Sequence, residues 1–174
     1  MSFITGLMNL GRKANIAKGS VVAAKDIMKG KLNITDVTEM ASVSKLLRSP
    51  EADKFVLSAK KQNAEILSDV IVKPYYNATL RVITKKLPSG TTIKNVYDDI
   101  EGFYGKQIIN KKGSVIARSK REFDGSKINH VFMENYQTGQ NFVGEFGEKL
   151  EYTSSTWPAV ISTTLRDVLK MVNV

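Results

Sequence analysis

Residues 114–136 have the sequence SVIARSKREFDGSKINHVFMENY, and this stretch decides the fold class. Its β-branched and aromatic residues lie on both sides of Asp124-Gly125, a dipeptide that is among the stronger short signals for a hairpin. We therefore predict two antiparallel strands, Ser114 to Phe123 and Lys127 to Tyr136, joined by a tight turn.

Turn signals on either side extend this hairpin into an antiparallel meander. Gly113 and Gly139 mark the neighbouring turns, and the β-branched segment Thr79 to Lys85 is followed by a Leu-Pro-Ser-Gly turn. The remaining predicted strands are Gln107 to Asn110, Asn141 to Phe146 and a short one at Lys149 to Tyr152.

Two further segments return to helical spacing. A short amphipathic helix, inserted between strands and ending at Gly105, is predicted from Ile93, Val96, Tyr97, Ile100, Phe103 and Tyr104. A C-terminal helix from Pro158 to Met171 is predicted from Ile161, Leu165, Val168 and Val172.

The first 73 residues are predicted to be helical. Ser49-Pro50-Glu51 is a strong helix start, and the helix that it begins is expected to run to about Leu67. Earlier helices are expected along the stripe of Phe3, Leu7 and Leu10, over Val21 to Lys29, and from Thr35 or Asp36 to Arg48. The fold class is therefore α+β, with an N-terminal helical segment (residues 1–73) and an antiparallel β domain carrying the inserted and C-terminal helices (residues 74–174).

Composition excludes several kinds of chemistry. The 174 residues include no Cys and a single His, His130, so disulfides, thiolate metal sites and two-histidine metal sites are ruled out. No phosphate-binding glycine loop and no nucleophile elbow occurs. We interpret His130 as a structural residue, and Asp98, Asp99 and Glu101 as a solvated helix face. We assign no catalytic, cofactor-binding or metal-ligating residue and expect no enzyme.

No stretch of the sequence is expected to span a membrane as a helix. The longest uncharged run, Met1 to Gly11, is much shorter than the roughly 20 residues that a spanning helix needs. Arg12 and Lys13 follow this apolar run instead of preceding it, which is the wrong order for a secretory signal.

Positive charge is concentrated in two segments. The chain has a net charge of +9; residues 1–31 carry six basic residues against one acidic, and residues 106–127 carry seven against two. Electrostatic function should be sought there. The candidate partner-binding residues are Phe3, Leu7, Leu10, Arg12 and Lys13 in the first segment, and Lys111, Lys112, Arg118, Lys120 and Arg121 in the second.

Each segment leaves alternatives open. The basic hairpin suits the phosphates of a nucleic acid, an acidic protein neighbour, or protection of a sheet edge. The N-terminal amphipathic stripe suits a membrane interface, a partner subunit, or the chain's own core. Its glycines and small residues favour close packing against protein over a lipid surface.

The chain resembles the small virion proteins of tailed bacteriophages, in particular tail-tube, baseplate and tail-completion components. The resemblance lies in the absence of Cys and of catalytic motifs, and in the hairpin-plus-helix plan of Thr79 to Lys85 and Ser114 to Tyr136. It implies a sandwich or barrel-like sheet that continues between copies, a homo-oligomer or multi-chain complex, and no cofactor. It also implies location in the virion after assembly in the host cytoplasm; outside that resemblance we expect a cytoplasmic protein.

The leading hypothesis is therefore a non-enzymatic structural subunit that makes contacts through its terminal helices and basic hairpin. The positive charge departs from the neutral or acidic lumen expected of a DNA-conducting tube, so the hairpin is expected to face a partner. A nucleic-acid-binding accessory protein and a peripheral membrane protein are the alternatives.

Overall fold

The computed structural model describes residues 17–30, 37–74, 79–100, 102–123, 129–135, 141–145, 151–153 and 163–172. These residues form helices and antiparallel strands, which confirms the α+β prediction. The N-terminal candidates Phe3, Leu7, Leu10, Arg12 and Lys13 lie outside the described residues.

The described strands form one antiparallel sheet whose spatial order follows the chain order from β1 to β9, so the predicted meander is confirmed. This single open sheet differs from the sandwich or barrel-like sheet that the resemblance implied. The strands are β1 (Ser20–Ala23), β2 (Glu65–Lys73), β3 (Leu80–Lys86), β4 (Thr92–Asp98), β5 (Gly102–Ile109), β6 (Val115–Phe123), β7 (Asn129–Asn135), β8 (Asn141–Glu145) and β9 (Glu151–Thr153).

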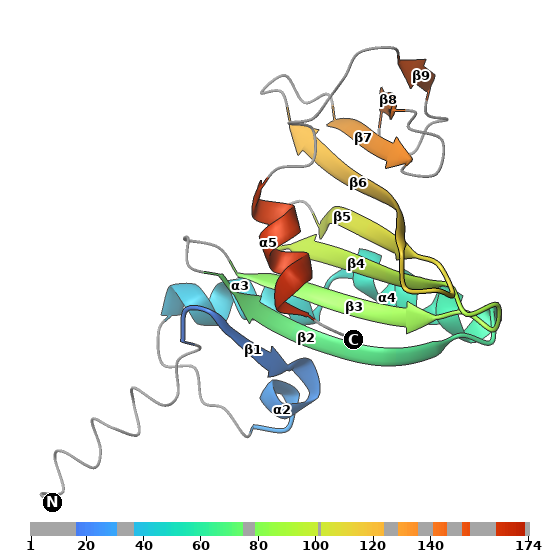
Figure 1. The fold of residues 1–174 in the computed structure, drawn as a ribbon. Helices are drawn as coiled ribbons and strands as arrows, with labels where there is room; N and C mark the ends of the chain where they lie inside the picture. The colour runs from blue at the N-terminus through green and yellow to red at the C-terminus, as the bar shows by residue number, and fades with distance from the viewer. Residues whose placement is uncertain are drawn as a thin grey trace, which may run out of the picture.

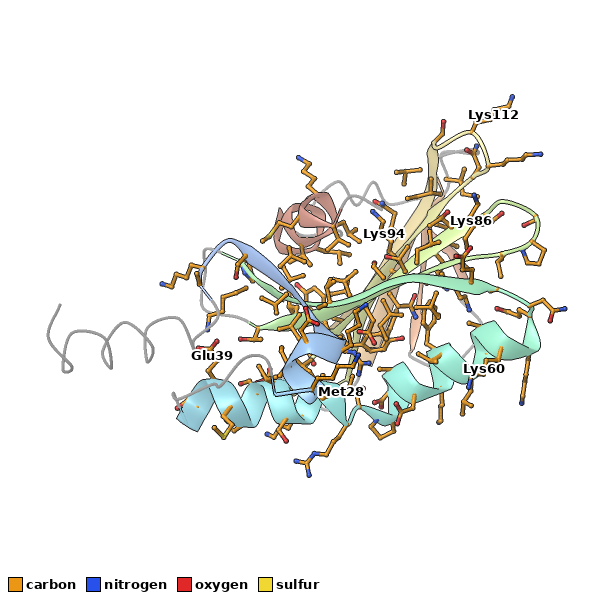
Figure 2. The ribbon with its side chains drawn as sticks, turned by 90° about the horizontal axis from the view of Figure 1, so that it is seen from below. Met28, Glu39, Lys60, Lys86, Lys94 and Lys112 are labelled. Carbon is orange, nitrogen blue, oxygen red and sulfur yellow. The ribbon has the colours of Figure 1, made fainter. Side chains whose placement is uncertain are left out.

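Helices cover both faces of the first half of the sheet. Helices α3 (Val37–Leu47) and α4 (Pro50–Lys61) lie on one face, and α5 (Thr163–Met171) lies on the other (Figures 1 and 2). A short helix, α2 (Ala24–Met28), follows β1 directly. The core region is therefore a three-layer arrangement of helix, sheet and helix.

Each interface between the sheet and its covering helices has its own apolar cluster. The α3 and α4 face buries Val43, Leu46, Ala52, Phe55, Ile71, Ile83 and Tyr97. The α5 face buries Val72, Leu80, Val82, Val96, Leu165, Val168, Leu169 and Val172. Each fully buried aliphatic side chain contributes about 1.5–3 kcal/mol, so α5 is an integral part of the fold.

The predicted inserted helix is wrong, because its residues form β4 and β5. β4 is covered on both faces: Tyr97 packs toward α4, whereas Val96 packs toward α5. Apolar residues therefore occur at both odd and even positions, and this pattern imitates helical spacing. The turn between the strands is held by Asp98 Oδ1, which accepts hydrogen bonds from the backbone N–H groups of Ile100 and Gly102.

Two of the helices predicted in the N-terminal segment also differ in extent from the prediction. The helix that starts at Pro50 is capped as predicted, since Ser49 Oγ accepts from Ala52 N at 3.3 Å, but it ends at Lys61 and the chain continues into β2. The predicted helix over residues 21–29 is strand β1 followed by α2. Residues 65–73 are thus strand rather than helix, and the predicted boundary at residues 73/74 falls between β2 and β3, which pair with each other.

Candidate functional site

The basic turn between β5 and β6 is rigidly built. Asn110 Oδ1 accepts hydrogen bonds from Lys112 N at 3.0 Å and Ser114 N at 2.9 Å, and Gly113 adopts a φ of +85° that favours glycine. Lys111 and Lys112 are both exposed in this turn. The hairpin predicted from sequence therefore presents two cations at its tip.

The other predicted hairpin cations, Arg118, Lys120 and Arg121, all lie in β6, which leads away from this turn. The strand register places Arg118 opposite Glu134 of β7 and Lys120 opposite Phe132. The same register pairs His130 with Glu122 of β6 and with Glu145 of β8.

The tip lysines belong to a larger cationic surface, which we call the basic end. Its members are exposed lysines at the C-terminus of α4, at the end of β3 and in the β5–β6 turn: Lys60, Lys61, Lys86, Lys111 and Lys112. Figure 2 shows Lys60, Lys86 and Lys112 at the same end of the sheet. Glu65 pairs with Lys86 in the strand register and so lies beside this group.

A hollow of about 530 Å³ lies in the basic end, between the β3–β4 and β5–β6 turns. Its lining combines apolar Pro88 and Ile109 with cationic Lys86 and Lys111. The two turns touch at Gly90, where an added Cβ would lie 2.9 Å from Lys111 Cγ. The hollow is thus an open recess whose lining is partly apolar, partly polar and positively charged.

The opposite end of the sheet carries carboxylates, and we call it the acidic end. It consists of Glu51 and Asp53 in the first turn of α4 and Asp98, Asp99 and Ile100 at the β4–β5 turn. The predicted solvated helix face of Asp98 and Asp99 is therefore part of a strand end and its turn. Ile100 is 81% exposed, the highest value among the large apolar side chains of the described residues.

A third surface is the uncovered part of β2. β1 pairs only with Val70–Lys73, so residues 65–69 have no strand partner on that side among the described residues. Figure 1 shows β2 continuing well beyond β1 and α2. A groove of about 370 Å³ runs along this edge, lined by Ala23, Lys25, Met28, Ile66, Leu67, Ser68, Asp69 and Val70.

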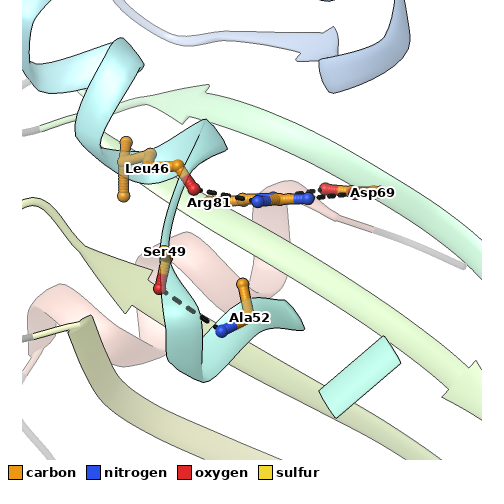
Figure 3. A network of polar contacts seen from close by, with 5 residues as sticks. All are labelled: Leu46, Ser49, Ala52, Asp69 and Arg81. Carbon is orange, nitrogen blue, oxygen red and sulfur yellow. Dashed lines mark hydrogen bonds and ion pairs between the residues drawn. The ribbon is translucent and has the colours of Figure 1, made fainter. Parts of the chain in front are cut away.

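A buried ion pair fixes the helical layer to the sheet (Figure 3). Arg81 of β3 donates two hydrogen bonds to the carboxylate of Asp69 in β2, at 2.8 and 2.6 Å, and a third to Leu46 O near the end of α3, at 2.8 Å. Burial lowers the pKa of Arg81, but the hydrogen bond and charge of Asp69 outweigh it and leave the pKa raised. The guanidinium therefore satisfies a helix carbonyl and a strand carboxylate at once.

Three lysines lie within the sheet rather than at its ends. Lys94 of β4 donates to Val172 O, just after α5, and Lys85 donates to Gln62 Oε1 with its Nζ 4.2 Å from the centroid of the Phe55 ring. Burial lowers the pKa of Lys94 and of Lys106, and burial together with the charge of Lys106 lowers that of Lys85.

The lowered pKa values of these three lysines predict that the fold becomes more stable as the pH is raised. Between each folded-state pKa and the ordinary lysine value of 10.5, the unfolded chain binds more protons than the folded chain, so the free energy of unfolding rises with pH. Above pH 10.0 the raised pKa of Tyr97 opposes the trend. Urea unfolding of Lys106→Met across this range should give a smaller pH slope than the wild type, whereas Lys112→Met should keep the wild-type slope. Equal slopes in all three proteins would contradict the prediction.

Comparisons with known proteins found no matching family model, no matching curated protein and no matching solved structure. Over the described ranges, no helix combines the length and apolar character needed to cross a membrane. In the same ranges, no group of three or more His, Cys, Asp or Glu side chains is arranged to hold a metal ion.

Proposed function

We propose that the protein is a non-enzymatic structural subunit of a large multi-protein assembly. The observation that carries this proposal is the edge of β2 at residues 65–69, which has no strand partner on that side among the residues that the structure describes. Residues 65–69 offer backbone hydrogen-bonding groups on the side away from β3, beside a groove that contains the exposed side chains of Ile66 and Met28. Soluble proteins normally protect such edges, because an open edge pairs readily with another chain.

The chemistry of the edge favours an extended protein segment as its occupant. A strand added to β2 would satisfy the backbone groups and bury the apolar side chains of the groove.

The resemblance stated from the sequence narrows this proposal to the virion of a tailed bacteriophage. We propose a tail or baseplate component, present as a homo-oligomer or within a multi-chain complex and assembled in the host cytoplasm. The basic hairpin that the sequence assigned to partner contacts is part of the proposal, because its tip lysines are exposed.

A negative charge introduced in the groove, at Met28, is predicted to weaken subunit association, whereas the same charge outside the groove is not. This side chain is 59% exposed, and Leu57 on α4, outside the groove, is 56% exposed. Met28→Glu should weaken association with neighbouring subunits at least tenfold, because it places an unpaired charge in an apolar contact. Leu57→Glu is the matched control and should bind like the wild type in a sedimentation or pull-down titration. Equal binding by all three proteins would exclude the β2 edge as a contact.

Nucleic-acid binding is the second candidate function, and the basic end favours it. Five exposed lysines in one place, next to the strand that contains Arg118 and Lys120, could contact several phosphates. Such binding weakens steeply as salt rises, because each phosphate contact releases counterions. Binding that ignores salt, or that survives Arg118→Ala with Lys120→Ala, would reject this candidate.

A further inference from the structure

We propose that copies of the chain associate head to tail, with the acidic end of one copy docked on the basic end of the next. In this contact Ile100 of one copy enters the hollow between the β3–β4 and β5–β6 turns of the other. The inference rests on the proposed function, since it names a second copy of the chain as one of the subunit's partners.

The two ends cannot neutralise each other within one copy. β4 starts at Thr92, which lines the hollow of the basic end, and finishes at Asp98 in the acidic end. Seven residues of strand at about 3.3 Å each separate the ends by roughly 20 Å. Charges so far apart are screened from one another at physiological salt. Neither end therefore neutralises the other within one copy.

The charges at the two ends are complementary. Glu51, Asp53, Asp98 and Asp99 gather at one end, with Lys45 and Arg48 beside them. At the other end the five exposed lysines are joined by Glu65. α4 alone shows the same polarity, since it begins with two carboxylates and ends with two lysines. Opposed potentials of this kind steer docking and fix its orientation.

The shapes of the two ends are complementary as well. Ile100 protrudes from its turn with 81% of its surface exposed, and Asp98 and Asp99 immediately precede it. The hollow offers apolar Pro88 and Ile109 to such a side chain, with Lys86 and Lys111 available to the carboxylate of Asp99. A side chain that fills a pocket on the partner, with surrounding contacts that exclude water, is a common form of a strong contact.

A second copy of the chain accounts for more of the features of the two ends than a bound nucleic acid does. Phosphates would account for the lysines, but not for the acidic cluster or for the exposed isoleucine within it. A head-to-tail contact uses both ends, and each open complex keeps one free end of each kind. Repetition of the contact therefore produces a ring or a filament, which are forms that suit a structural subunit.

A charge exchange between the two ends tests the proposal. The variants are Lys111→Glu at the basic end and Asp99→Lys at the acidic end, and their masses are measured by sedimentation velocity at low salt. We expect the wild type to form concentration-dependent oligomers, and each single variant to associate at least tenfold more weakly. An equimolar mixture of the two variants should recover assembly, because every contact between unlike variants again joins opposite charges. Ile100→Ser should also weaken assembly, and Lys29→Glu, on an exposed residue outside both ends, should not.

The possible outcomes separate this inference from the proposed function. Oligomers that persist in both single variants, or a mixture that fails to recover assembly, overturn the head-to-tail contact and leave the structural role standing. A wild type that is monomeric but binds DNA through Lys111 overturns the contact in favour of a nucleic-acid surface. A wild type that joins neither its own copies nor any neighbouring subunit contradicts both proposals.

Discussion

Replacing Tyr97 by alanine is expected to lower the free energy of unfolding by about 3–5 kcal/mol, the range for removing a buried aromatic ring. The side chain is 1% exposed and lies between Phe55 and Phe103, with ring centroids 6.5 and 6.3 Å away in edge-on arrangements. Its loss leaves a cavity where α4 packs on β4 and β5. Because a small domain has only about 5–15 kcal/mol of stability, much of the population should unfold at moderate temperature.

Tyr97→Phe is the matched control for this prediction. It keeps the ring and loses the hydrogen bond that Asn95 Nδ2 donates to Tyr97 Oη at 3.1 Å, at a cost of about 1 kcal/mol. Chemical denaturation of both variants gives the comparison. A Tyr97→Ala variant as stable as Tyr97→Phe would show that this cluster does not hold the helical layer to the sheet.

The second large effect is expected at Arg81. Arg81→Met removes the partner of Asp69 and leaves Leu46 O without its side-chain donor. Breaking a buried pair costs about 3–5 kcal/mol; since Asp69 is 25% exposed, we expect about 3 kcal/mol. Hydrogen exchange should increase first in α3, because this guanidinium is one of two polar links from α3 to the sheet among the described residues; the other is the ion pair of Glu39 with Lys73 of β2 at 3.5 Å.

Two further variants give this prediction its control. Arg48→Met removes an exposed guanidinium just after the last residue of α3. This variant should change the free energy of unfolding by less than about 0.5 kcal/mol. Arg81→Met combined with Asp69→Leu should recover part of the loss, because no buried charge is left unpaired. If the single Arg81 variant is no less stable than Arg48→Met, the ion pair has no structural role.

Local signals were sufficient for much of the fold. Ser49-Pro50 predicted the start of α4, and Asp124-Gly125 with its flanking strands predicted the meander. Prediction failed where strands are buried on both faces. In β4, apolar residues on both faces imitate a helix, so the strand pair that holds Tyr97 and the turn of Ile100 was missed.

The candidate surfaces were harder to predict, because tertiary structure brings their parts together. Lys111 and Lys112 were identified from local charge, but Lys60 and Lys86 join them only through the pairing of β2 with β3 and the contact between two turns. One local signal was present. The charge order along α4, from Glu51 to Lys61, already runs in the same direction as that from the acidic end to the basic end.

The most direct test of the structural role is the native mass of the protein in its source, measured after gentle extraction. The account predicts a particle many times heavier than one chain, which dissociates when the β2 edge or the charged ends are altered. Recovery of the native protein as a single free chain, at every concentration and in the presence of the other proteins of its source, would contradict it.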